Sequence, residues 1–320
     1  MSKKTEMMVF TVYVPTNRGL KIARAYGMQC INEISEWYTK REARPMQCEE
    51  KEARGEEIPD IMRRSSKDRV VVGIMGEDIL YNFYAKAGGI TLMPGLNHGC
   101  EAESSTGVYR GKMLKLEEKK AYPNTIFGLP TLCLLGREGT PIKECRAKEY
   151  TQSLDASLCK IGEILRKRSG KRQIVIAVDQ RYAAAAANIV QGAIGATQDR
   201  FNQFRTPQPE ITIEWRTMDG KVDVTAAVDE TIDYAIDVVL SGKTCQENGL
   251  GIYAKLFKSD GILVCNRKAM EINWDISTLQ EEWGMQRLEA IAKKDDKLTY
   301  DAFRKLKEDA RETGSSGGIH

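Results

Sequence analysis

Two acids and a short polar turn lie close together between residues 229 and 250. Asp233 and Asp237 are four residues apart, and apolar residues recur around them at helical spacing. We therefore expect a helix over 230–240 that carries both carboxylates on neighbouring positions of one face. The turn at 241–244 supplies hydroxyls, an ammonium and backbone amides before a second expected helix, which suits a phosphate group. Together these features predict a phosphate at the turn and a polyol held by the carboxylates.

A purely structural interpretation of the same residues is also open. Acids such as Asp233 would stabilise the first turn of a helix through its dipole. Gly242 suits the position just past a helix end, and Thr244 with Glu247 suits a capping box. A kinase-type P-loop is excluded, because its motif requires glycine where Asp237 stands.

The composition is typical of an ordinary soluble, cytoplasmic chain. Its 320 residues suggest two domains, and a net charge of +3 gives no argument for a nucleic-acid groove or a membrane anchor. A histidine-based triad or metal site would depend on His98 alone, since the other histidine is the last residue. The eight cysteines contain no C-x-x-C pair, and we find neither a signal region nor an apolar run long enough to span a membrane.

Short apolar runs alternate with stretches of helical period, which predicts an α/β fold. The expected strands are 9–14, 70–74, 131–135, 174–178, 211–215 and 261–265, and the expected helices are 18–40, 79–86, 150–168, 182–194 and 230–240. The turns after the first two strands are candidate ligand sites, because open α/β sheets bind ligands at the carboxyl ends of their strands. The polar, glycine-containing stretch 94–125 is expected to form a surface insertion or lid.

Residues 233–250 resemble the phosphoribosyl-diphosphate loop of ATP phosphoribosyltransferase, the first enzyme of histidine biosynthesis. Both acids, Gly242, Thr244 and the Asn-Gly-Leu at 248–250 match the family's D-A-I-x-D-L-V-x-T-G-x-T-L-x-x-N-G-L. Further matches follow in family order at 17–20 (P-K-G-R-L), 58–60 (D-I-P), 72–80 (D-L-G-I-x-G-x-D-x-L) and 220–224 (a G-S-V-E-V strand).

This resemblance implies a two-lobed, periplasmic-binding-protein-like (type II) α/β fold with the active site in the interlobe cleft. Lobe I would comprise 1–126 and 258–290, with 94–125 as an insertion, and lobe II would comprise 127–257. Residues 291–320 would form a charged helix and a flexible tail. The implied reaction is attack of N1 of ATP's adenine on C1 of phosphoribosyl diphosphate, with pyrophosphate leaving and Mg²⁺ assisting.

The resemblance also implies roles for individual residues. Asp233 and Asp237 would be catalytic, holding the ribose hydroxyls and stabilising the positive charge that develops on the sugar. Arg18 would bind the pyrophosphate, while Asp78, after Gly76, would reach the nucleotide or metal, or simply cap its helix. No metal ligand is assigned. The residues implied to bind the 5-phosphate are Ser241, Gly242, Lys243 and Thr244.

Departures from the family pattern concern the acceptor. The stretches 127–131 and 178–182 differ from the family's Gly-Cys-Arg step and T-S-Y-P turn, so sugar-phosphate binding is better supported than ATP as acceptor. Two alternatives stay open: the same transfer to another heterocycle, and a non-catalytic two-lobed protein that binds a phosphorylated ligand. The short C-terminal part implies a short-form chain, which would form homo-oligomers and bind a separate regulatory subunit resembling a histidyl-tRNA synthetase.

Overall fold

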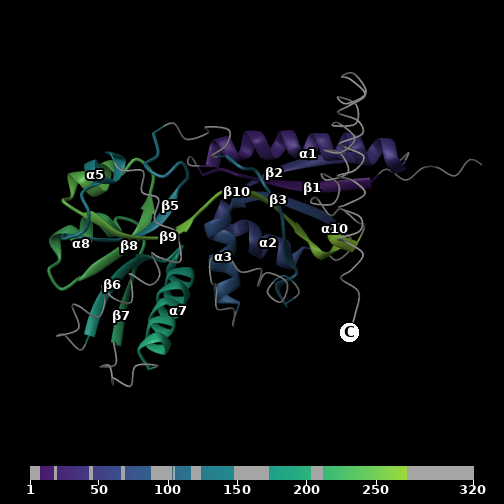
Figure 1. Ribbon diagram of the computed structural model, residues 1–320. Helices are drawn as coiled ribbons and strands as arrows, with labels where there is room; N and C mark the ends of the chain where they lie inside the picture. The colour runs from purple at the N-terminus through teal and green to yellow at the C-terminus, as the bar shows by residue number, and fades with distance from the viewer. Residues whose placement is uncertain are drawn as a thin grey trace, which may run out of the picture. The chain divides into compact units, whose positions relative to one another are not determined.

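The computed structural model of the chain contains two five-stranded β-sheets with helices packed on them (Figure 1). Arg18, the predicted helix at 150–168 and the C-terminal segment 291–320 lie outside the described residues. The structure describes residues 8–17, 20–42, 46–65, 69–87, 103, 105–116, 124–147, 173–202 and 212–271.

The first sheet has the strand order β2-β1-β3-β10-β4. Strand β1 runs parallel to β2 and β3, whereas β10 runs antiparallel to β3 and β4. All seven residues of β3 are buried, as expected for a central strand covered on both faces. The strands are β1 (Met8–Pro15), β2 (Met46–Ala53), β3 (Val70–Gly76), β4 (Val108–Met113) and β10 (Gly261–Asn266), and the helices are α1 (Lys21–Glu42), α2 (Ile58–Arg64), α3 (Glu77–Lys86) and α10 (Arg267–Glu271).

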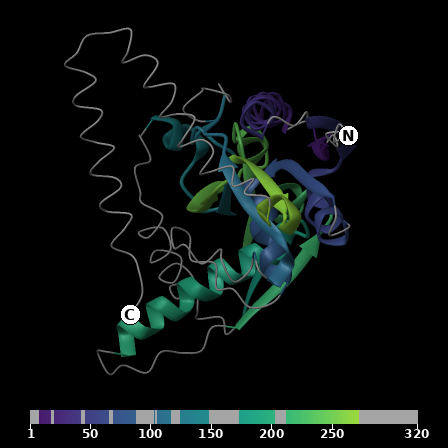
Figure 2. The same ribbon diagram turned by 90° about the vertical axis from the view of Figure 1, so that its right-hand side faces the viewer.

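The second sheet repeats this pattern in the order β7-β6-β8-β5-β9. Strand β6 runs parallel to β7 and β8, and β5 runs antiparallel to β8 and β9. The long helix α7, teal in Figures 1 and 2, packs its apolar residues on one face of this sheet, and α8 packs on the other. The strands are β5 (Thr131–Gly136), β6 (Gln173–Asp179), β7 (Thr212–Met218), β8 (Tyr234–Val239) and β9 (Gly251–Lys258), and the helices are α5 (Ile142–Ala147), α7 (Ala183–Asn202), α8 (Val222–Val228) and α9 (Lys243–Glu247).

The chain crosses between the sheets twice. It passes from the first sheet to the second between β4 and β5, and it returns between β9 and β10. The two crossing segments are joined where the N–H of Ser259 donates to the carbonyl oxygen of Pro130 at 2.8 Å. This double crossing between two similar sheets confirms the predicted two-lobed α/β fold. The residue limits of the two lobes stay a prediction.

All six predicted strands are present, but the helix predicted at 230–240 is wrong. Residues 234–239 form strand β8, and a turn precedes it. Tyr234 and Ile236 are buried on the α7 side, while Ala235 and Val239 are buried on the α8 side. A strand covered on both faces is a continuous apolar run, and such a run also satisfies helical spacing.

Besides β8, three strands were not predicted, and each has a physical reason. Strand β2 is an edge strand with four charged residues among its eight, as is common where an exposed edge must not pair with another chain. Strand β9 was not predicted because apolar and polar residues do not alternate clearly along its sequence. Strand β4 lies inside 94–125, and it pairs with β10 while Leu114 and Leu116 just after it are buried. This part of the expected surface insertion therefore belongs to the sheet.

A further correction concerns 220–224, which resembled a strand of the family. Gly220 and Lys221 have φ values of +73° and +53°, and α8 begins directly after them. The segment is therefore a left-handed turn that starts a helix. The turn is stabilised where the N–H of Gly220 donates to the carboxylate of Asp179 at 3.2 Å.

Asn82 connects the two lobes through the start of α7. Its Oδ1 accepts the N–H groups of Ala184 at 3.1 Å and Ala185 at 3.3 Å, and the residue is only 5% exposed. The first amides of a helix have no partner within the helix, and alanine side chains cannot supply one. The α7 N-terminus is therefore capped by a side chain of α3. Nearby, the rings of Tyr81 and Phe257 meet edge to face at 4.9 Å.

Replacing Asn82 with alanine is expected to lower the free energy of unfolding by about 1 kcal/mol, since it removes the cap of a buried helix end. For a chain of 320 residues that corresponds to a fall in Tm of roughly 1–2 °C, measurable by calorimetry. Gln29→Ala is the matched control, because the Gln29 amide makes an exposed hydrogen bond to Glu33 within α1. Equal Tm values for the Asn82 and Gln29 variants would show that this contact adds nothing to stability.

Candidate functional site

The turn at 241–244 lies at the carboxyl end of β8 and opens α9. Gly242 has a φ of +67°, which glycine adopts without strain. A Cβ atom there would lie 2.5 Å from Cδ1 of Ile126 and 2.8 Å from Cγ2 of Ile142. Both the backbone and the space therefore require glycine at 242. The turn is tightened further where the N–H of Lys243 donates to Oγ of Ser241 at 3.4 Å.

The polar groups of this turn remain accessible. Lys243 and Thr244 are exposed, whereas Cys245 and Leu250 are buried in the core and anchor α9 to the sheet. The Lys243 ammonium lies 3.7 Å from Glu247, an exposed pair that restrains it only weakly. Gly242 itself is the N-cap of α9, so the proposed helix-end glycine and Thr244 capping box are wrong. The turn thus presents hydroxyls, an ammonium and helix-start amides to solvent.

Asp237 stands on the strand that leads into this turn. Its Oδ1 accepts the N–H of Val238 at 2.7 Å, and the side chain is half-buried. Burial raises the pKa of Asp237 to about 6, and the neighbouring carboxylates of Asp223 and Asp179 act in the same direction. The carboxylate is therefore held in a partly desolvated place where a positive charge would stabilise it.

The structure does not bring Asp233 to the turn. It stands just before β8, at the far end of that strand, where its Oδ2 accepts the N–H of Val175 at 3.0 Å. Its own N–H donates to the carbonyl oxygen of Val175, also at 3.0 Å. Four residues of extended chain span about 13 Å, so Asp233 and Asp237 do not share a helical face as predicted. Asp233 joins β8 to β6 instead.

Two residues at the end of β6, Asp179 and Arg181, were not predicted as site residues. Oδ1 of Asp179 accepts the Arg181 backbone N–H at 2.8 Å and its Nε–H at 2.9 Å, and Oδ2 accepts from Nη2 at 2.7 Å. Burial would raise the pKa of Asp179, but the hydrogen bonds from Arg181 outweigh it and lower that pKa. The only sequence signal was an acid and an arginine in the turn that departs from the family pattern.

A cavity of about 180 Å³ lies between the two lobes, beside these residues. Gly76 and Asp78 line it from the first lobe, and Arg181 and Tyr182 line it from the second. Oδ1 of Asp78 accepts the hydroxyl of Ser259 at 2.5 Å, and burial raises the pKa of Asp78. Gly76 and Asp78 therefore both line the cleft, and their predicted role in substrate binding stays a prediction.

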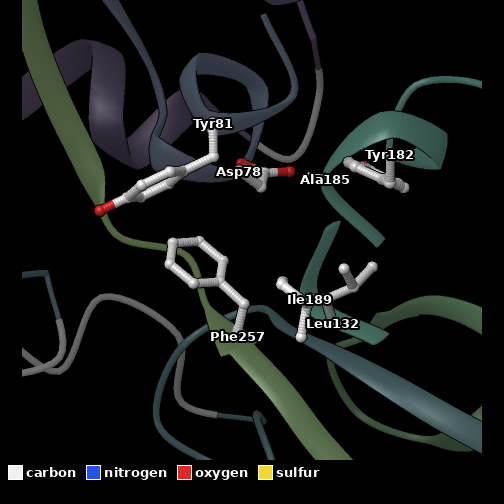
Figure 3. Close-up of a pocket in the computed structure, with 7 residues that line it drawn as sticks. All are labelled: Asp78, Tyr81, Leu132, Tyr182, Ala185, Ile189 and Phe257. Carbon is white, nitrogen blue, oxygen red and sulfur yellow. The ribbon is translucent and has the colours of Figure 1, made fainter. Parts of the chain in front are cut away.

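Asp78 and Tyr182 also line a narrow apolar pocket next to this cavity, shown in Figure 3. In that view the carboxyl group of Asp78 lies between the side chains of Tyr81 and Tyr182, while Phe257 and Leu132 form the opposite wall. A carboxyl group at the junction of a polar cavity and an apolar pocket can orient a flat, partly polar ligand.

No group of three His, Cys, Asp or Glu side chains is arranged to hold a metal ion within the described ranges. Mg²⁺ commonly binds through one or two carboxylates together with substrate phosphates. The expected Mg²⁺ therefore stays a prediction, with no ligand assigned.

The family model for ATP phosphoribosyltransferase matches residues 150–290, a little under half of the chain. That stretch includes the turn at 241–244, Asp237 and Arg181. The resemblance inferred from the motifs is confirmed. This part of the chain is similar to ATP phosphoribosyltransferase, although it departs from the family pattern at 178–182.

A curated relative, the ATP phosphoribosyltransferase of Hydrogenobaculum sp. (strain Y04AAS1), is 32% identical over 63 residues. The match covers 20% of this chain and 30% of the relative, so the chain spans under a third of that protein. Among solved structures, the ATP phosphoribosyl transferase (HisG:HisZ) complex from Thermotoga maritima gives a TM-score of 0.40 at 12% identity, covering 85% of this chain and 97% of that one. The aliphatic sulphonate binding protein SsuA from Escherichia coli gives 0.39 at 10% identity, covering 89% and 72%.

Proposed function

We propose that this protein is a phosphoribosyltransferase, which moves the 5-phosphoribosyl group of phosphoribosyl diphosphate to a ring nitrogen and releases pyrophosphate. N1 of ATP is the first candidate acceptor. The observation that carries the proposal is the turn at 241–244, whose central Gly242 cannot bear a side chain and whose polar groups are accessible. The family match over the same residues supports it.

The turn would bind the 5-phosphate of the donor. Ser241 and Thr244 offer hydroxyls, Lys243 offers an ammonium, and the start of α9 offers amides without helical partners. These groups surround a terminal phosphate without approaching C1, where the bonds change. Their contribution is therefore to binding and to positioning the sugar.

Asp237 would act on the sugar itself. As the bond from C1 to the diphosphate breaks, positive charge grows on the ribose, and a fixed carboxylate stabilises that charge more than it stabilises the ground state. With a pKa of about 6, Asp237 is mostly ionised at neutral pH. Partial burial strengthens its interaction with the developing charge, because the local dielectric constant is lower.

The remaining expectations stay proposals. ATP and another heterocycle both remain candidates for the acceptor, and Mg²⁺ would accompany the diphosphate. A homo-oligomer and a separate regulatory subunit are proposed from the family resemblance, and a cytoplasmic location is proposed from the composition. In the described part of the chain, no helix combines the length and apolar character needed to cross a membrane.

The test is a pyrophosphate-release assay with phosphoribosyl diphosphate, Mg²⁺ and ATP, repeated with a panel of heterocyclic bases. Release with ATP would establish the first acceptor, and release with another base alone would establish the second candidate. Stabilisation by phosphoribosyl diphosphate without turnover, even with a histidyl-tRNA-synthetase-like subunit added, would instead identify a binding protein. Absence of both binding and turnover would refute the proposal.

Thr244→Ala is expected to weaken binding of ribose 5-phosphate about 10-fold, since it removes one hydroxyl that bonds a charged phosphate. Titration calorimetry with ribose 5-phosphate measures this directly and does not depend on the acceptor. Thr212→Ala is the control, because Thr212 is an exposed threonine at the opposite end of the same sheet. Unchanged affinity in the Thr244 variant would mean that this hydroxyl does not touch the phosphate.

A further inference from the structure

Arg181 is the one cationic side chain among the described residues that line the cleft cavity. Glu56, Asp78 and Asp260 line the same cavity, so an anionic group entering it would meet three acids. A diphosphate is strongly anionic and needs a positive partner in such surroundings. Arg181 is the described residue placed to supply it.

The guanidinium of Arg181 is fixed from behind. Its Nε and Nη2 bind both oxygens of Asp179, which is 1% exposed, while 42% of the Arg181 side chain remains exposed. The same guanidinium lies 5.4 Å from the centre of the Tyr182 ring. A guanidinium has five N–H donors in a rigid fork, so a bidentate bond to one carboxylate leaves donors for a second oxyanion. Arg181 is therefore pre-organised for such a ligand.

The sheet places this arginine beside the sugar-phosphate turn. Strands β6 and β8 are parallel neighbours, and their last paired residues are Val178 and Ile236. The next residues are Asp179 and Asp237, which therefore stand level on strands about 4.8 Å apart. Arg181 follows at the edge that also carries the turn at 241–244. Val238 and Leu240, which lead into that turn, line the same cavity as Arg181.

The start of α7 does not compete for the anion. A helix N-terminus often binds phosphate through its free amides. In α7 the amides of Ala184 and Ala185 already donate to Oδ1 of Asn82. These two amides are therefore engaged, whereas the side chain of Arg181, just before this helix, lines the cavity.

We infer that Arg181 binds the diphosphate of the sugar donor, at the opposite end of the substrate from the turn at 241–244. The inference rests on the proposed function. During transfer the C1–O bond breaks and its electron pair stays on the diphosphate, while the lone pair of the acceptor nitrogen forms the new C1–N bond. Arg181 stabilises the charge gained by the leaving diphosphate. Asp179 is a positioning residue that holds the guanidinium in place.

Titration calorimetry with two separate probes tests this inference. Inorganic pyrophosphate with Mg²⁺ reports on Arg181, and ribose 5-phosphate, which lacks the diphosphate, reports on the turn. Arg181→Met is expected to weaken pyrophosphate binding about 10- to 100-fold and to change ribose 5-phosphate binding less than about 2-fold. Arg181→Lys keeps the charge without the fork, and an intermediate loss is expected.

Arg216→Met is the matched control. Arg216 forms the same acid-x-arginine pair with Glu214, at 2.8 Å, but it does not line the cavity. Pyrophosphate binding that survives in Arg181→Met, or a loss equal to that of Arg216→Met, would overturn the inference. The inference would also be overturned if Arg181→Met weakened only the binding of the acceptor. If the wild-type protein binds ribose 5-phosphate but not pyrophosphate, the inference fails and the function stands; if it binds neither, both fail.

Discussion

Gly242→Ala is expected to weaken binding of ribose 5-phosphate by at least about 10-fold. An L-residue at a left-handed φ costs roughly 1–2 kcal/mol, and here the new methyl group would also press on Ile126 and Ile142. The turn can relieve both only by moving, which displaces the amides and hydroxyls that would surround the phosphate. Titration calorimetry with ribose 5-phosphate measures the loss.

Gly107→Ala is the control that separates the backbone cost of a left-handed φ from the displacement of the turn. Gly107 has a nearly equal φ of +70°, but no atom lies within 4 Å of the position its Cβ would take. This variant should therefore lose similar stability from the backbone and keep its affinity for ribose 5-phosphate. If Gly242→Ala bound the ligand as the wild-type protein does, the turn would not be the phosphate site.

Asp237→Asn is expected to lower kcat about 10²- to 10³-fold while leaving the affinity for phosphoribosyl diphosphate nearly unchanged. The carboxylate would act on charge that exists only in the transition state, and losing one such group typically costs this much. Steady-state and binding measurements together separate the two effects. Asp233→Asn is the control, because Asp233 stands just before the same strand and away from the turn, and its kcat should stay within about 3-fold. Equal losses in both variants would restore the paired-acid interpretation that the structure contradicts.

The same substitution should stabilise the protein above pH 6. In the folded protein Asp237 has a pKa of about 6, whereas an unfolded aspartate titrates near 3.9. Between these values the unfolded chain has lost the proton that the folded chain keeps, so the stability contributed by Asp237 falls as pH rises. Asparagine has no such loss. Denaturant unfolding at pH 8 should show a gain of about 3 kcal/mol that vanishes below pH 4.

The prediction from sequence was most accurate where the hydrophobic pattern was compatible with only one type of secondary structure. Strands such as β3 and β5 are short apolar runs between turns, and both were predicted. The apolar run before Gly242 was compatible with two types of secondary structure. Tyr234 to Val239 have the spacing of a helix, but they also suit a strand that is buried on both faces. Only the pairing of β8 with β6 and β5 decides between them. Tertiary pairing, which local spacing does not report, therefore settled the element that carries Asp237.

The site was predicted only in part, because the residues that strand pairing brings together are not adjacent in the sequence. Ser241 to Thr244 are contiguous, so their chemistry was visible in the sequence, and the turn is where it was expected. Arg181 lies about sixty residues before them, and only the parallel pairing of β6 with β8 brings it alongside. Asp233 was close in sequence but is far away in space, because an extended strand separates residues that a helix would bring together.

The most direct measurement is a crystal structure of the protein soaked with phosphoribosyl diphosphate. We expect density for the 5-phosphate against residues 241–244, with the ribose next to Asp237 and the diphosphate next to Arg181. Density for the sugar phosphate at any other place, or a turn at 241–244 closed off by packed side chains, would contradict this expectation.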